Sequence, residues 1–253
     1  MDQLDSYILI NEFFGTMILA IAISSSFILD QEGNVLGSNK FVLISIVFTA
    51  KVFMLRLGGT DYNPGLTFMK LITYKDKEKL KFMNRIILPS IIMQTIGAIC
   101  GFLMSYYFRN GFVFKLCIHK DSSPAAGFFV EIFCTFFLFL IVLIVDDSEV
   151  EKSSDVMKVI VVVAGIITGI SLGGNISGAG MNPAIGFGAN FAIFLVTGNL
   201  SELKYLWIYL IGPFISSYLA SAFFLAVYKN NQLTEEKGSR KLILDIRKYL
   251  LNR

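Results

Sequence analysis

Two asparagine–proline pairs are the residues of this chain best suited to chemistry, because they interrupt long apolar stretches. They are Asn63-Pro64 and Asn182-Pro183. Asparagine is a favoured N-cap and proline a favoured first helical residue, so each pair predicts the start of a helix. The side-chain oxygen of each asparagine can cap its own helix, which leaves the NH2 group as a donor for a passing polar molecule.

The elements that must position these pairs are membrane helices. The chain has 253 residues, of which 55% are hydrophobic and 16% charged, whereas a soluble domain carries about 25% charged residues. A bilayer span needs about 20 apolar residues. Six candidate spans lie near 8–29, 40–57, 84–107, 126–145, 157–173 and 205–228. We therefore predict an all-α membrane protein with six transmembrane helices and two re-entrant half-helices.

The half-helices are the apolar stretches 65–72 and 184–196, which follow the two pairs and are too short to cross a bilayer. Backbone at membrane depth is tolerated only when it is buried in protein or lines water. We expect the two stretches to enter from opposite faces and to meet end to end. Each N-terminus carries about half a positive charge, so their meeting point should repel protons and cations.

The spacing of acids and asparagines indicates an internal duplication. The same interval of 51 positions separates Glu12 from Asn63 and Glu131 from Asn182. Each half contains three spans, and an odd number turns the second half upside down in the membrane. The sequence therefore predicts an inverted repeat, with halves of about 1–119 and 120–228 and a site at the midplane.

The distribution of positive charge predicts the orientation. Fourteen of the 22 Lys and Arg residues lie in the loops 70–81 and 146–158 and in the tail 229–253. Positive charge favours the inner side of a membrane, so both termini should face the cytosol or its matrix equivalent. Plasma and organellar membranes both remain open. The basic amphipathic tail 229–253 could lie on an anionic leaflet or on a partner, and a loosely ordered solvated tail is the alternative.

Other chemistries find no support in the residue pattern. Cys100, Cys117 and Cys134 are odd in number and two lie inside spans, so neither a disulfide framework nor a metal cluster is expected. His119 has no second ligand nearby. No nucleotide-binding loop or catalytic triad is visible. We therefore predict no enzyme activity, no cofactor, no metal site and no nucleic-acid partner.

From about residue 8 to 228 the chain resembles the aquaporin, or major intrinsic protein, family. The resemblance rests on GGTDYNPGLT (58–67), MQTIGAICG (93–101), SGAGMNPAIGFGAN (177–190) and WIYLIGP (207–213). It implies one pore per subunit and usually a homotetramer. It also implies that Glu12 and Glu131 are buried carboxylates that accept hydrogen bonds from the re-entrant loops. The pore residues that it implies are Asn63, Pro64, Gly65, Asn182, Pro183 and Ala184.

The chain departs from the family at the constriction. Ile185 stands where the family has an arginine that repels cations. The other constriction positions, counted without gaps, are Leu43, Ile170 and Ala179, so all four are apolar. A wide apolar ring would pass water and small neutral solutes with weak selectivity, and a narrow one would dewet and close. Gly65 in place of alanine should cost its half-helix up to about 1 kcal/mol.

Three charged residues near the first pair also differ from the family pattern. Asp61 stands where the family often has histidine. Lys51 and Arg56 are expected to hold loop carbonyls or to snorkel to the inner interface. One of these two is the expected partner of Asp61.

Two functions follow from these features. The first is a passive membrane channel for water and small neutral solutes. The alternative is an accessory subunit of a larger membrane complex, for example in the mitochondrial inner membrane, that keeps the fold with reduced or no conduction. A fold alone does not decide between them.

Overall fold

We describe the protein from a computed structural model. The described residues are 3–30, 35–56, 61–73, 77–112, 114–147 and 155–230, and every structural statement below refers to them. The predicted amphipathic segment of the tail lies outside these ranges.

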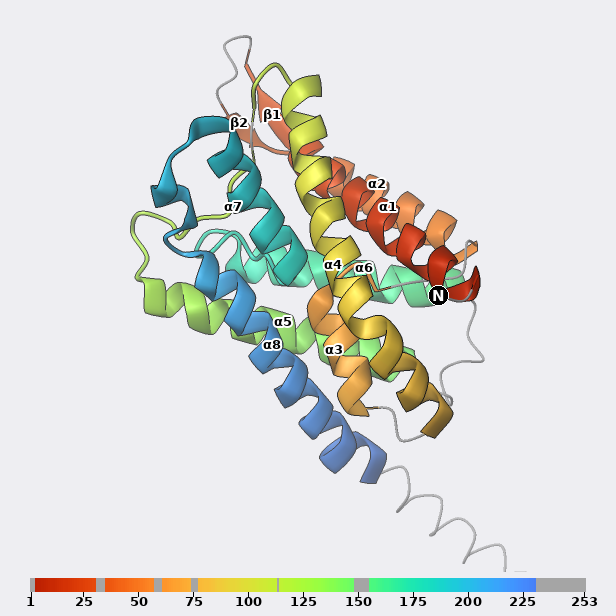
Figure 1. Cartoon of the computed structure of the whole chain (residues 1–253). Coiled ribbons are helices and arrows are strands. Elements are labelled where there is room, and N and C mark those ends of the chain that lie inside the picture. Colours follow the sequence, from red (N-terminus) through yellow and green to blue (C-terminus); the bar gives the residue numbers. More distant parts are fainter. Residues whose placement is uncertain are drawn as a thin grey trace, which may run out of the picture.

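The chain folds as two runs of four helices, and Figure 1 follows them from red to blue. The first run contains α1 (Gln3–Ser25), the hairpin β1 (Phe27–Leu29) and β2 (Val35–Ser38), α2 (Lys40–Arg56), α3 (Pro64–Thr73) and α4 (Lys77–Phe108). The second contains α5 (Pro124–Val145), α6 (Asp155–Gly173), α7 (Pro183–Thr197), the 3-10 turn η1 (Leu200–Leu203), α8 (Leu206–Phe223) and the π-helical turn η2 (Phe224–Tyr228). In both runs the third helix is short and begins at the proline of an asparagine–proline pair.

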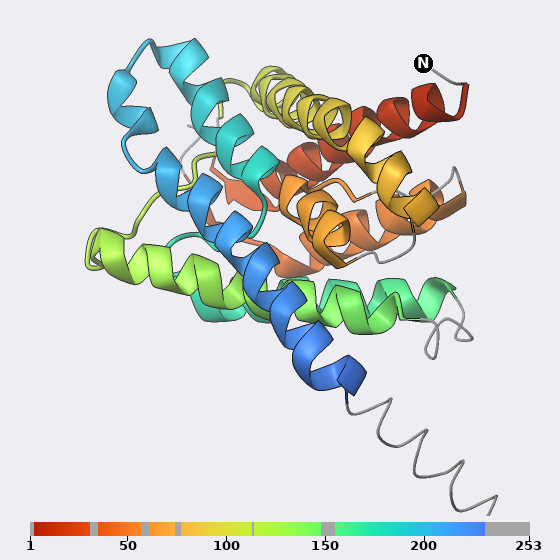
Figure 2. The ribbon, with the colours of Figure 1, turned by 60° about the horizontal axis from the view of Figure 1, so that its bottom comes forward.

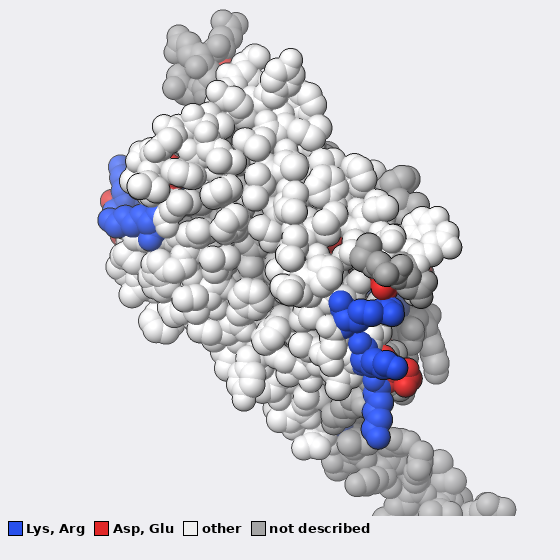
Figure 3. Space-filling view, viewed as in Figure 1, with Lys and Arg blue, Asp and Glu red and all other residues white. Residues whose placement is uncertain are grey.

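Most of the long helices can span a membrane. Within the described ranges, the helical segments long and apolar enough are Gln3–Ser25, Leu80–Phe108, Pro124–Val145, Asp155–Gly173 and Leu200–Tyr228. Helix α2 corresponds to the remaining predicted span, 40–57. It has 17 residues, which is about 26 Å at 1.5 Å per residue. Figure 3 shows Lys and Arg side chains gathered at two ends of this face, with a wide uncharged belt between them.

Two predicted spans have different bounds in the structure. The apolar run 8–29 was expected to be one helix, but α1 ends at Ser25 and the run continues into β1, which pairs antiparallel with β2. A short apolar run does not distinguish helix from strand. The span expected at 84–107 belongs to a helix that starts earlier, at Lys77, because hydropathy detects only the part of a helix that lies within the apolar layer.

Close packing of α1 on α4 fixes the first half. An added Cβ at Gly97 would lie 2.3 Å from the carbonyl oxygen of Phe13, and one at Gly101 would lie 2.4 Å from that of Met17. Small residues four apart let helix backbones approach closely in membranes. The crossing of α1 and α4 therefore requires both glycines.

The half-helices are enclosed by the long helices. Both α3 and α7 pack against α4 and α8, and they also contact each other. Figure 2 shows α3 in the middle of the bundle with long helices around it, and in Figure 1 α7 lies above α3. We call the end of the bundle where α3 finishes the α3 side, and the end where α7 finishes the α7 side.

A candidate pore between two half-helices

The two asparagines cap the half-helices with their side-chain oxygens. Asn63 Oδ1 accepts a hydrogen bond from the backbone N–H of Gly65 at 3.0 Å. Asn182 has an extended backbone, and its Oδ1 accepts from the N–H of Ala184 at 3.0 Å and of Ile185 at 3.4 Å. These bonds satisfy N–H groups that a helix start leaves without partners.

The side-chain amides then connect the two halves to each other. Asn63 Nδ2 donates to the carbonyl oxygen of Met181 at 2.9 Å, and Asn182 Nδ2 donates to that of Tyr62 at 2.8 Å. Both asparagines are almost fully buried and line the same cavity. Because an amide nitrogen carries two protons, each side chain keeps a second donor beside the one used in this cross-connection.

A buried carboxylate supports the loop before α3. Glu12, in the middle of α1, accepts hydrogen bonds from the backbone N–H groups of Asp61 at 3.1 Å and of Tyr62 at 2.9 Å. Its side chain is 2% exposed. A buried acid of this kind needs such donors to offset its desolvation.

Glu131 supports the second loop in the same way. It accepts from the N–H groups of Gly180 at 2.8 Å and of Met181 at 3.0 Å, and from the hydroxyl of Ser177 at 2.6 Å. Tyr209 on α8 adds a bond from its hydroxyl to the carbonyl oxygen of Ser177 at 2.6 Å. Helices α5 and α8 therefore both hold the loop that leads into α7.

Both loops hold a non-glycine residue in the left-handed region immediately before the asparagine. The φ angle is 55° at Tyr62 and 46° at Met181. Such a conformation costs on the order of 1–3 kcal/mol and persists only where its surroundings impose it. The N–H groups bound by Glu12 and Glu131 belong to these same residues, so the acids hold the backbone in the shape that points each half-helix at the other.

A central cavity of about 90 Å³ lies between the loops. Asn63 and Asn182 contribute its amides and Asp61 a carboxylate, and the other lining side chains are mostly apolar. A cavity of this size has room for a few water molecules in file, each taking about 30 Å³ of liquid volume.

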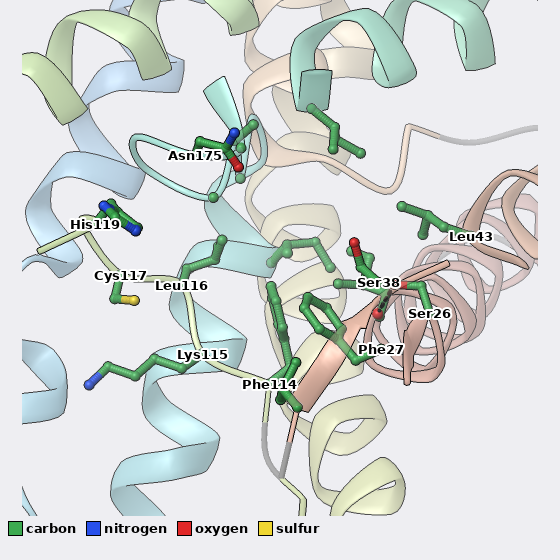
Figure 4. A pocket seen from close by; sticks show the side chains of 18 of the residues that line it. Ser26, Phe27, Ser38, Leu43, Phe114, Lys115, Leu116, Cys117, His119 and Asn175 are labelled. Carbon is green, nitrogen blue, oxygen red and sulfur yellow. Dashed lines mark hydrogen bonds between the residues drawn. The ribbon is translucent and has the colours of Figure 1, made fainter. Parts of the chain in front are cut away.

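A larger cavity of about 490 Å³ opens on the α7 side. Figure 4 shows Phe27 and Phe114 close together on its wall, with Lys115 reaching away from them. Lys115 forms an ion pair with Glu202 on η1, and the rings of Phe27 and Phe114 lie 5.1 Å apart. The wall therefore combines an aromatic side with a charged rim.

Arg109 holds the chain next to this cavity, where α1 leads into the hairpin. It follows the last residue of α4 and donates to the carbonyl oxygens of Ser24 and Phe27, with its guanidinium 5.0 Å from the ring centre of Phe112. Burial lowers the pKa of Arg109 from its usual value, but a guanidinium stays protonated in proteins. It fixes the end of α1 and the start of β1.

The two cavities share an apolar boundary. The residues that line both are Ile23, Leu43, Ile170, Ala179, Gly180 and Ile185. The four predicted constriction residues are among them, although they come from α2, α6, the second loop and α7. Ile185 is 2% exposed. No charged side chain belongs to this shared set.

The structure gives Asp61 a partner that sequence reasoning missed. Its carboxylate lies 2.6 Å from Nζ of Lys70, in the last turn of α3. Lys51 and Arg56 are the partners expected from sequence, and the structure describes their helix but not their side chains. The position of Lys70 could have indicated this pairing, because it is a basic residue in the last turn of the half-helix that follows the loop of Asp61.

Other reactive groups lie apart from one another. Within the described ranges, no three His, Cys, Asp or Glu side chains are grouped so that they could hold a metal ion. The three cysteines are free thiols: Cys117 is exposed, Cys100 is half-buried and Cys134 is buried.

An integral membrane protein with two half-helices that meet inside a helical bundle has the architecture of a pore. The family model of the major intrinsic proteins matches residues 5–224. The chain belongs to the major intrinsic protein family.

Curated relatives and a solved structure agree with this family. The chain is 28% identical over 206 residues to Aquaporin AqpM of Methanothermobacter marburgensis, covering 73% of this chain and 76% of the relative. It is 31% identical over 185 residues to an aquaglyceroporin of Plasmodium berghei, covering 68% and 69%. With Aquaporin-4 of Mus musculus it shares 28% identity over 198 residues, and the match spans 56% of that relative. The X-ray structure of the aquaglyceroporin from Plasmodium falciparum matches with a TM-score of 0.72 at 22% identity, over 88% of this chain and 97% of the other.

Proposed function

We propose that the protein is a passive membrane channel for water and small neutral solutes. The observation that carries the proposal is the cross-connection of the half-helix starts: each asparagine caps its own helix and donates to the opposite loop. Each amide keeps one further proton, and both asparagines line the central cavity, where a water molecule can accept from each of them. The aquaporins and aquaglyceroporins among its relatives favour the same function.

Two half-helix N-termini add a positive potential at the centre of this path. Each contributes about half an elementary charge, which opposes the entry of protons and cations but not of neutral molecules. A water held by Asn63 and Asn182 has its oxygen toward both amides, so it cannot pass a proton onward. We infer that the centre selects for neutral solutes.

The apolar boundary sets the proposed breadth of selectivity. Leu43, Ile170, Ala179 and Ile185 offer neither hydrogen-bond donors nor charge, so they discriminate by size and not by chemistry. A polyol such as glycerol and an amide such as urea are therefore expected to pass through the channel at rates that depend on their diameter.

We propose further that residues 1–228 form the channel domain, made of inverted halves of about 1–119 and 120–228, with 229–253 as a basic tail. Both termini would face the cytosol or its equivalent, and the channel would assemble as a homotetramer without cofactor or catalytic activity. The accessory-subunit alternative gains no support from the relatives, whose names are those of channels.

Stopped-flow light scattering tests the function. Vesicles that contain the purified protein should shrink several-fold faster than empty vesicles in an osmotic gradient. Ile185→Trp should abolish the gain by filling the boundary, whereas Ile211→Trp, at an exposed site of α8, should leave it intact. Permeability of the unmodified protein no faster than that of empty vesicles would rule the channel out.

A further inference from the structure

The central cavity contains one formal charge whose role the channel proposal leaves unassigned. Among the described residues that line it, Asp61 is the charged side chain. Its carboxylate is 10% exposed and lies 2.6 Å from Nζ of Lys70, whose side chain is 23% exposed. Because Lys70 is in the last turn of α3, the pair extends from the central cavity toward the α3 side.

The pair is not needed to hold the loop in place. The backbone N–H of Asp61 is already bound by Glu12 at 3.1 Å, and that of Tyr62 by the same carboxylate at 2.9 Å. Asn63 is held by its own cap and by Met181. The loop thus keeps its anchors without the side chain of Asp61, which points to an electrostatic role for the ion pair.

The magnitude of the charge decides what that role is. The two half-helix N-termini together supply about one positive elementary charge at the centre of the path. An unpaired carboxylate would supply one negative charge beside it and cancel most of that barrier. The apolar boundary at Ile185 carries no positive charge that would repel cations, because the arginine of the family pattern is absent. Negative groups in a pore favour cations.

Lys70 is placed to remove this negative charge. Its second partner, Asp146 Oδ2 at the end of α5, is farther away at 3.8 Å and is half exposed to solvent. The closer contact is with Asp61. A partly buried pair is also less screened by salt than an exposed one.

We propose that Lys70 is a selectivity-determining residue, which neutralises Asp61 and thereby keeps cations out of the channel. The proposal rests on the proposed channel function. It assigns to a lysine on the α3 side part of the cation exclusion that Ile185 cannot provide.

Sodium influx into vesicles, followed with a sodium-sensitive dye, tests the proposal beside the water permeability of the same vesicles. Lys70→Met should raise sodium influx about tenfold, the lower end of the roughly 10- to 1000-fold rise in counter-ion concentration in clefts lined by one sign of charge. Lys70→Arg should stay at the level of the unmodified protein. Lys204→Met, which removes a lysine that lines neither cavity, is the matched control.

A neutral double variant separates charge from packing. Asp61→Asn combined with Lys70→Met should return sodium influx to the original level, and Asp61→Asn alone should not raise it. Lys70→Gln serves as a second charge-removing variant if Lys70→Met does not fold. The role of Lys70 would be overturned by unchanged sodium influx in a charge-removing variant that still conducts water. A higher sodium influx in Asp61→Asn alone would overturn it as well. If the unmodified protein conducts water no faster than empty vesicles, the proposed channel function itself is ruled out.

Discussion

Gly65 stands in the first half where the second half has Ala184, and the side chain opposite explains the difference. A Cβ added at Gly65 would lie 2.7 Å from Cζ and 2.8 Å from Cε2 of Phe139 on α5. Phe139 is fully buried. The sequence alone suggests only a weaker helix start at glycine, whereas the structure shows that the ring of Phe139 occupies the space of the missing methyl group.

Gly65→Ala should therefore lower stability although alanine is the better helix former. Overpacking costs typically 1–3 kcal/mol, which outweighs the gain of about 1 kcal/mol in helix propensity. The midpoint of thermal unfolding in detergent should fall. Gly65→Ala with Phe139→Leu should be more stable than the sum of the two single changes predicts. Gly37→Ala, where an added Cβ meets nothing within 4 Å, is the neutral control, and an unchanged midpoint in Gly65→Ala would contradict the explanation.

Ile185 is the residue at which the pore departs most from its family. An arginine there would bring a charge and up to five donors into the apolar boundary, and it would also narrow the opening. Ile185→Arg should reduce glycerol flux more than water flux, so the ratio of water to glycerol permeability should rise at least several-fold. Ile185→Leu, which conserves side-chain volume, should change neither the glycerol flux nor the water flux. A ratio in Ile185→Arg equal to that of the unmodified protein would show that the boundary lies elsewhere.

At the scale of elements, the two half-helices depend on acids that lie in other helices. Glu12 in α1 and Glu131 in α5 each bind two successive backbone N–H groups before an asparagine. The second N–H in each case belongs to a residue with positive φ. The acids therefore set the direction of α3 and α7, and the long helices act as the frame that keeps both half-helices aimed at the centre.

Glu131→Gln should destabilise the α7 loop. The glutamine offers one acceptor oxygen where the carboxylate serves three donors at two oxygens, and a buried donor without a partner costs about 1–3 kcal/mol. We expect a lower thermal midpoint together with reduced water permeability per molecule. Asp121→Asn, at an exposed site (76% exposed), tests for general effects of removing a carboxylate. A fully stable and active Glu131→Gln would show that the loop holds its shape without the acid.

At the scale of the whole molecule, the distribution of charged groups supports the proposed membrane orientation. Ion pairs at the α3 side join α1 to α4 through Asp5 and Arg85, and α5 to the segment after η2 through Asp147 and Lys229. Between the two ends, the face seen in Figure 3 shows few charged side chains. The excess of positive charge in the loops 70–81 and 146–158 and in the tail 229–253 favours placing this side inward.

The orientation can be tested with Cys117, which lines the cavity on the α7 side and is exposed. A membrane-impermeant maleimide added to intact cells should label Cys117, and Cys117→Ser should abolish the labelling. A cysteine introduced by Asn230→Cys in that background should react only after the cells are made permeable. Labelling of the Asn230→Cys variant in intact cells, with no labelling of Cys117 in the unmodified protein, would reverse the orientation.

The sequence by itself determined the features that neighbouring residues encode. Helix starts at Pro64 and Pro183, apolar lengths and the repeated interval from acid to asparagine all depend on local chemistry, so they can be read along the chain. Hydropathy misjudged the ends of α1 and α4, because it measures where a segment is apolar and not where its backbone hydrogen bonds stop.

Only the tertiary structure decided which groups from the two halves meet. The bonds from Asn63 to Met181 and from Asn182 to Tyr62 join residues 118 and 120 positions apart, and the partner of Asp61 and the ring opposite Gly65 follow from packing. Leu43 and Ile170 border both cavities with Ile185 because α2, α6 and α7 converge there. Such contacts depend on how the faces of separate helices fit together, and no local pattern in the sequence specifies that fit.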